Sequence, residues 1–374
     1  MKQKQKQKQK QHIQSIYFLR LFAMMMVVLV HVTAAYATVL PFASEAYQKY
    51  HFLNRIVRIE AGIFIVITGL VFFYSYINKP LTKTLWKTYY ARRVTYILVP
   101  YIIWALIYEF YSYYVGATEL NAADIVKRIL RGESYYQLHF IFLIVQVYLV
   151  LPVFVWLAQK VTIFKKYMWL FGIIIQLGYL MLNNTYHITS FNLFLNTMAT
   201  FLLGGWIGIY YREQVDKKYS RSNIVLFLVT LGSGIAISLL NYHLYTMKTI
   251  QISGFTYEAV NTLYLVAGSY FFFRIAEILA EKLSVKSVTI VKNIAMYSFG
   301  FYLIHPMVLN FVAKAVPIQG NYMFHFEILA RYILTLAGCY LIIWGCHRLL
   351  PFASFLFGKL PKEAVFIYRR PDHK

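Results

Sequence analysis

Two ionisable residues in the first apolar segment have the types and the spacing that chemistry inside a membrane needs. Arg20 and His31 stand at the two ends of RLFAMMMVVLVH. In an α-helix this spacing puts both side chains on one face, separated by roughly 16 Å along the axis. Arg20 then lies at the cytosolic boundary and His31 near mid-membrane, where an imidazole could act as a base near neutral pH. The alternative is an arginine that reaches the interface and a histidine satisfied by a neighbouring helix.

A second polar stripe follows near the C-terminus, in the segment SFGFYLIHP. Ser298, Tyr302 and His305 have helical spacing and line one face. His305 lies about as deep in the membrane as His31, so the two imidazoles could meet. Pro306 predicts a kink that exposes a backbone carbonyl. The alternative interpretation is a polar packing stripe next to a proline kink.

The segment KPLTKTLWKTYYARR interleaves cations with aromatic residues on the predicted cytosolic side. It is typical of a topology signal that also contacts anionic lipids. It could instead bind a polyanionic cytosolic ligand, with Arg92 and Arg93 gripping phosphate groups.

Other ionisable residues are weaker candidates because each is costly in lipid and is more often a structural ion pair or a boundary residue. They are Glu60, Glu109, His139 and Arg274. The sequence shows no histidine and carboxylate spacing of a metal site, no glycine-rich phosphate loop and no nucleophile elbow. We therefore expect no metal.

The elements that must position these residues are transmembrane helices. Of the 374 residues, 60% are hydrophobic and 14% charged, whereas soluble domains carry about 25% charged residues. Apolar runs of about 20 residues recur at 16–38, 58–78, 94–115, 137–158, 167–183, 191–211, 224–242, 258–278, 293–315 and 328–349. The sequence predicts an all-α membrane bundle of about ten transmembrane helices.

The charge distribution predicts that both termini are cytosolic. The excess of 37 Lys+Arg over 14 Asp+Glu would suggest nucleic acid in a soluble protein, but in a membrane protein it follows the positive-inside rule. We expect no nucleic-acid partner. We predict a basic cytosolic tail at 1–15, a transmembrane domain at 16–350 and a second basic cytosolic tail at 351–374.

These segments resemble the acyltransferase family 3 membrane proteins. Arg20 and His31 match the family's Arg-x10-His pattern, and FIVITGLVFF is similar to its FFVLSGF, with Gly69 retained. ARRVTYILVPY and YQLHFIFLIVQVYLVLP resemble two further segments, although His139 stands where tryptophan is usual. YSFGFYLIHP matches S-x-x-x-Y-L-x-H-P. The resemblance covers residues 16–350 and looks most like the intercellular adhesion protein C group, which is associated with polymeric N-acetylglucosamine.

The resemblance implies transfer of an acyl group, most often acetyl, from cytosolic acyl-CoA to a hydroxyl of a cell-surface glycan. Acyl-CoA would be a co-substrate rather than a permanently bound cofactor. His31 would be the base or the acyl relay, and Tyr302 or His305 would stabilise the oxyanion. Arg20, Arg92 and Arg93 would hold the CoA phosphates. Ser298, Glu60 and His139 would form the rest of the polar stripe.

The resemblance also implies a multi-pass protein of a bacterial plasma membrane, with a glycan acceptor that could be lipid-linked. Membrane lipids and a glycan synthase are the other expected partners. A second function remains open, because members of the closest group have been regarded as exporters of the polysaccharide itself. A third alternative is a non-catalytic partner of a glycan synthase, against which the pairing of Arg20 with His31 argues.

Overall fold

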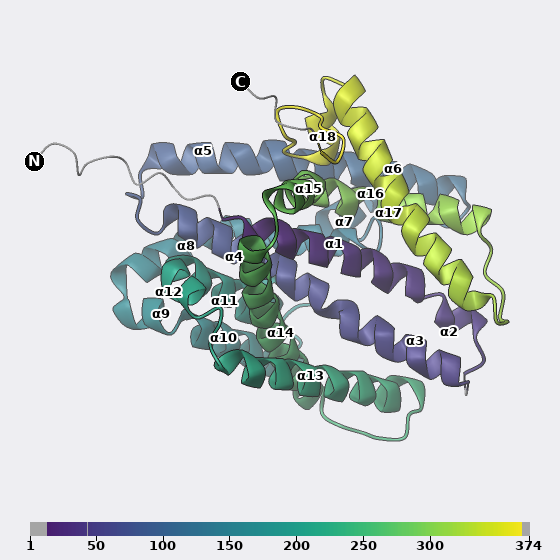
Figure 1. The fold of residues 1–374 in the computed structure, drawn as a ribbon, viewed down its shortest axis with the longest axis horizontal. Helices are drawn as coiled ribbons and strands as arrows, with labels where there is room; N and C mark the ends of the chain where they lie inside the picture. The colour runs from purple at the N-terminus through teal and green to yellow at the C-terminus, as the bar shows by residue number, and fades with distance from the viewer. Residues whose placement is uncertain (1–12, 43, 369–374) are drawn as a thin grey trace, which may run out of the picture.

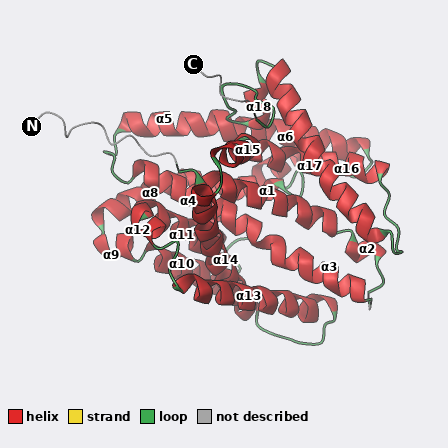
Figure 2. Cartoon of the chain, in the orientation of Figure 1, coloured by secondary structure: helices red, strands yellow, loops and turns green. Residues whose placement is uncertain are grey.

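A computed structural model of the protein describes residues 13–42 and 44–368, and the regular elements in this part of the chain are all helical (Figures 1 and 2). Each of the ten predicted spans contains a helix of at least 12 residues. These helices are α1 (Ser15–Thr33), α4 (Glu60–Tyr76), α6 (Val99–Tyr114), α8 (Leu138–Lys160), α10 (Met168–Tyr186), α11 (Met198–Ile209), α13 (Ser222–Asn241), α14 (Gly254–Lys282), α16 (Ser298–Ala315) and α17 (Phe324–Leu349). The predicted all-α membrane fold is confirmed.

Fewer than ten of these helices are long and apolar enough to cross a membrane on their own. Among the described residues seven apolar runs qualify. An eighth forms if α15 (Val285–Ala295) and α16, which meet at a bend of 58°, make one span. α10 and α11 are not among them. The chain is a multi-pass membrane protein, whereas the count of ten spans and the cytosolic placement of the termini stay predictions.

Two helices outside the predicted spans extend a predicted span at its N-terminal end. α3 (Glu45–Ile56) starts at Ser44, whose side chain accepts a hydrogen bond from the Tyr47 amide, and it continues through a 3-10 turn into α4. α5 (Lys83–Arg93) is capped by Thr82 in the same way and continues through a π-helical turn into α6. Apolar runs alone do not reveal these two extensions, because both contain charged residues.

The remaining helices are short: α2 (Tyr36–Val39), α7 (Ala122–Arg131), α9 (Thr162–Lys166), α12 (Tyr211–Asp216) and α18 (Ala353–Phe357). α18 belongs to the segment that we predicted to be a basic tail. Its Phe357 is buried, and the Trp104 indole donates a hydrogen bond to the Leu356 carbonyl at 2.8 Å. The chain after 350 therefore packs against the bundle. Residues 1–12 and 369–374 of the two predicted tails lie outside the described residues.

α1 runs through the middle of the bundle, with α4, α14, α16 and α17 packed around it (Figure 1). One side of α1 contributes Met24, Val27 and Val28 to an apolar cluster with α6, α16 and α17. Another side contributes Phe18 and Leu19 to a cluster with α4, α11 and α14. A third cluster joins α4 with α8, α10 and α11. Because α1 is packed on both sides, its polar residues face protein.

Glycines let α4 and α11 approach closely. A Cβ atom on Gly69 of α4 would lie 2.2 Å from the Phe201 carbonyl oxygen, and one on Gly204 of α11 would lie 2.2 Å from the Val66 carbonyl oxygen. Gly208, one turn further along α11, faces the Leu70 carbonyl in the same way. Small residues four apart are a common device for close helix packing in membranes. The retained Gly69 thus has a packing role.

Candidate active site

α1 and α16 bring His31 and His305 together. The two imidazole rings are stacked, with centroids 5.1 Å apart and an interplanar angle of 30°. His305 is fully buried, whereas His31 is partly exposed. The predicted meeting of the two histidines is confirmed, and His31 is the member of the pair that a substrate can reach.

The dipeptide His305–Pro306 fixes the tautomer of His305. Proline has no N–H, so the carbonyl of Tyr302, four residues earlier, loses its helical partner. The Nδ1 atom of His305 lies 3.0 Å from this oxygen and 3.1 Å from the Phe301 carbonyl oxygen. Because both partners are acceptors, Nδ1 carries the proton and Nε2 holds the lone pair. Nε2 is buried without a hydrogen-bond partner.

Tyr302 is held in place by a hydrogen bond to the loop before α8. Its hydroxyl donates to the Gln137 carbonyl at 2.5 Å, and the Gln137 side chain donates back to the Leu303 carbonyl at 3.4 Å. The Tyr108 hydroxyl donates to the same Leu303 oxygen at 2.8 Å. The Tyr302 hydroxyl therefore already donates its hydrogen bond to Gln137, which weakens the expectation that this hydroxyl stabilises an oxyanion.

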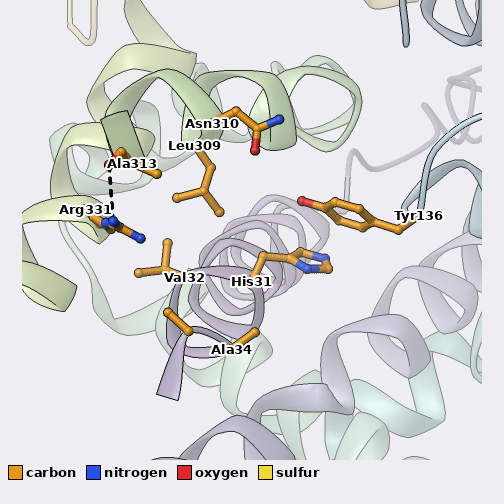
Figure 3. Close-up of a pocket in the computed structure, with 9 residues that line it drawn as sticks. His31, Val32, Ala34, Tyr136, Leu309, Asn310, Ala313 and Arg331 are labelled. Carbon is orange, nitrogen blue, oxygen red and sulfur yellow. Dashed lines mark hydrogen bonds between the residues drawn. The ribbon is translucent and has the colours of Figure 1, made fainter. Parts of the chain in front are cut away.

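A cavity of about 310 Å³ opens beside His31 (Figure 3). It is lined by His31, Val32, Ala34, Ala35, Tyr136, Leu309, Asn310, Ala313 and Arg331. These residues come from the end of α1, the second half of α16, the start of α17 and the loop before α8. The cavity therefore lies at the end of the bundle away from Arg20.

Three polar residues of this cavity were missed by the sequence analysis. The Tyr136 ring centroid lies 4.7 Å from that of His31, and its hydroxyl points into the cavity (Figure 3). The Tyr136 phenol is protonated near neutral pH and can donate a hydrogen bond. Arg331 donates hydrogen bonds to the Val316 carbonyl at 2.8 Å and to the Ala313 carbonyl at 3.2 Å. Asn310 of α16 lines another part of the cavity wall (Figure 3). The sequence does contain signals for two of these residues: Tyr136 belongs to a tyrosine pair just before the fourth predicted span, and Arg331 is an arginine inside the tenth.

The other predicted polar residues lie around this centre rather than in it. Glu60 is buried, its Oε2 atom has no hydrogen-bond partner, and it is near enough to Tyr302 to interact electrostatically. His139 is exposed in the first turn of α8, and its Nδ1 atom lies 2.5 Å from the Tyr136 carbonyl oxygen. Ser298 is buried two turns below His305 at the start of α16. Among the described residues no carboxylate bonds to His31 or His305.

Two of the three predicted phosphate-binding arginines converge on Tyr148 of α8. The Arg93 guanidinium lies 4.6 Å from the centre of the Tyr148 ring and 4.8 Å from that of Tyr89. Arg20 lies within electrostatic range of the same tyrosine. Arg92 instead lines a separate surface hollow of about 370 Å³ with Lys87. None of the three arginines takes part in a salt bridge among the described residues, so no carboxylate there neutralises their charges.

A second proline fixes the helix that carries Arg93. Pro152 lies inside α8 and leaves the Tyr148 carbonyl without its helical donor. Tyr89 of α5 donates to this carbonyl at 3.2 Å, and Tyr90 donates to the Leu149 carbonyl at 3.0 Å. α5 is thereby attached to α8 at its proline. This attachment places Arg93 over the Tyr148 ring.

Packed side chains separate the arginines from the histidines. Ala23, Met24 and Val27 lie between Arg20 and His31 on the same stripe of α1 and are buried. Arg20 does not line the cavity at His31. A donor arm that passes from one end of this stripe to the other must displace these side chains, and Met24 has the flexible side chain best suited to give way.

The sequence matches the family described as the acyltransferase domain Acyl_transf_3 over residues 13–344. The chain belongs to this acyltransferase family. The family match spans α1 to α17 and contains every residue of the centre described above.

Two relatives from Staphylococcus epidermidis, one of them from strain RP62A, are each named "Probable poly-beta-1,6-N-acetyl-D-glucosamine export protein". Each is 25% identical to this chain over 298 residues, covering 76% of this chain and 78% of the relative. No solved structure matches the chain significantly. The family therefore supports acyltransferase activity in general, whereas the relatives are named for export.

Proposed function

We propose that the protein transfers an acyl group, most often acetyl, from cytosolic acyl-CoA to a hydroxyl of a cell-surface glycan. The observation that carries the proposal is that His31 lines a cavity and stacks on the buried His305, inside a chain of an acyltransferase family. An imidazole at this position can act as a general base toward an acceptor hydroxyl.

In the proposed reaction the glycan enters the cavity and presents a hydroxyl to His31. The hydroxyl oxygen attacks the thioester carbon as its proton passes to His31. The new carbon–oxygen bond forms, the carbon–sulfur bond breaks, and the CoA thiolate leaves and takes up a proton. The Tyr136 hydroxyl points into the cavity and is the donor placed to stabilise the oxyanion.

The donor is proposed to bind at the other end of α1. The CoA phosphates would lie near Arg20 and Arg93, whose guanidinium groups meet no carboxylate among the described residues. The roughly 16 Å between Arg20 and His31 along α1 would be spanned by the pantetheine arm. Arg92 is expected to contribute less, since it lies on another face of α5.

The proposal is tested with purified protein in liposomes, supplied with acetyl-CoA and N-acetylglucosamine oligomers. We expect His31→Ala to lower acetyl transfer about 100-fold or more, the usual effect of losing a general base. The matched control is His243→Ala, because His243 bonds to Thr249 away from the cavity. Mass spectrometry of the oligomers measures the product. Equal transfer by both variants would remove His31 from the mechanism.

Export of an exopolysaccharide is the second candidate, and the printed names of the two relatives favour it. In that case the aromatic residues along the bundle would line a path for the polymer. A cell that lacks an exporter accumulates polymer inside, whereas a cell that lacks the acyltransferase secretes normal amounts of unmodified polymer.

A further inference from the structure

A row of tyrosine rings continues outward from the cavity at His31. The Tyr136 ring centroid lies 4.7 Å from that of His31, the Tyr135 centroid lies 4.9 Å from Tyr136, and the Tyr111 centroid lies 6.4 Å from Tyr135. We call Tyr136, Tyr135 and Tyr111 the tyrosine track. All three rings are partly or largely exposed, so they offer ring surface to a ligand.

The tyrosine track is connected to the cavity rather than to an aromatic belt in lipid. Asn310, which lines the cavity, donates a hydrogen bond to the Tyr135 hydroxyl at 2.9 Å. The Tyr135 ring also stacks on Tyr108, with centroids 4.3 Å apart and an interplanar angle of 15°. Tyr108 is fully buried. Belt tyrosines orient themselves by the bilayer interface, whereas Tyr135 is oriented by buried partners.

The loop that carries Tyr135 and Tyr136 is fixed at both ends, and Tyr111 belongs to α6. α7, which precedes the loop, is held to α6 by a salt bridge of 2.5 Å between Arg128 and the buried Glu109. Gly132 begins the loop at φ 73°, where a Cβ would lie 2.7 Å from the Phe142 Cβ. At the other end Gln137 is bonded to α16. A binding surface of this kind is already formed before its ligand arrives.

The chemistry of the cavity and the track together is that of a carbohydrate site. Pyranose rings expose faces of C–H groups, which stack on aromatic rings, and a rim of hydroxyls, which bond to amides, phenols and guanidinium groups. The track supplies the rings. Asn310 and Arg331 supply polar atoms at its inner end, where the Arg331 guanidinium turns toward the cavity (Figure 3).

We propose that the tyrosine track binds an extended glycan, so that the acceptor is a segment of several sugar rings rather than a single sugar or another small molecule. The inference rests on the proposed function, and it deepens it by naming the acceptor class. The sugar ring that receives the acyl group lies in the cavity at His31. The next rings of the chain lie over Tyr136, Tyr135 and Tyr111 in turn.

The test uses the full-length protein in liposomes and N-acetylglucosamine oligomers of increasing length. We expect kcat/KM for acetyl transfer to rise about tenfold or more from the single sugar to the longest oligomer, and Tyr111→Ala to remove most of this rise, since one aromatic contact contributes on the order of tenfold. Tyr111→Phe should restore it. The matched control is Tyr114→Ala, because Tyr114 is 83% exposed and on the same helix but outside the track.

Direct binding of the same oligomers, measured without acetyl-CoA, separates this inference from the proposed function. Length-dependent binding that Tyr111→Ala abolishes, without any acetyl transfer, would support the track and contradict the acyltransferase. Transfer that is equally fast to the single sugar and to the oligomers, and equal in Tyr111→Ala and Tyr114→Ala, would overturn the track and leave the acyltransferase standing.

Discussion

At the scale of single residues, the two prolines inside helices explain how the site is built. Each removes one backbone donor, and a side chain replaces it: the His305 imidazole at the Tyr302 carbonyl, and the Tyr89 hydroxyl at the Tyr148 carbonyl. An unpaired carbonyl is costly in a membrane interior. The side chain that replaces the missing backbone donor therefore stabilises the fold. At α16 the same hydrogen bond also orients the His305 imidazole.

This account predicts the stability of two variants at α16. His305→Ala leaves the Tyr302 carbonyl unpaired and should lower the free energy of unfolding by about 1–3 kcal/mol. Adding Pro306→Ala returns a backbone N–H to this carbonyl, so the double variant should be more stable than His305→Ala. Thermal unfolding in detergent measures the difference. A double variant that is no more stable than the single one would contradict the role given to Pro306.

The sequence predicted the site residues that share a helical face, but not the residues that the packing of other elements brings to His31. His31, Tyr302 and His305 were predictable because helical spacing fixes which residues share a face. Tyr136, Asn310 and Arg331 were not, since their approach to His31 depends on the path of the loop before α8 and on how α16 and α17 pack.

At the scale of elements, the close approach of α4 and α11 positions much of the bundle. α4 belongs to two of the three apolar clusters and contacts α1, so a change in its packing with α11 reaches the helix that carries His31. The sequence predicted both helices but not their contact. The packing role of Gly69 and Gly204 can be recognised only when it is known that the two helices lie against each other.

Gly204→Ala is expected to destabilise the protein by about 1–3 kcal/mol, the usual cost of overpacking, since its Cβ would meet the Val66 backbone at 2.2 Å. The matched control is Gly232→Ala, where nothing lies within 4 Å of the new Cβ. The control should be neutral or slightly stabilising because alanine favours the helix. Equal melting temperatures for the two variants would show that α4 and α11 do not pack this closely.

At the scale of the whole molecule, the two ends of α1 serve two proposed substrates. Arg20 and Arg93 mark one end and the cavity at His31 marks the other. The proposal requires that the arginine end faces the cytosol, where acyl-CoA is found. Charge asymmetry predicts this orientation.

Single cysteines test the orientation. In a background of Cys339→Ala and Cys346→Ala, we place a cysteine by Thr84→Cys or by Glu119→Cys, at opposite ends of the apolar run Lys83–Tyr114. A membrane-impermeant maleimide added to intact cells should label the Glu119→Cys protein and spare the Thr84→Cys protein. The reverse pattern would put Arg93 outside and leave the proposed donor site without acyl-CoA.

The central claim is that this chain acylates a glycan, and mass spectrometry of the surface glycan tests it most directly. The glycan is compared between cells with the protein, cells without it, and cells that carry His31→Ala. The account predicts normal amounts of polymer in all three, with the acyl groups lost in the last two. Unchanged acyl content, or polymer trapped inside the cells that lack the protein, would contradict it.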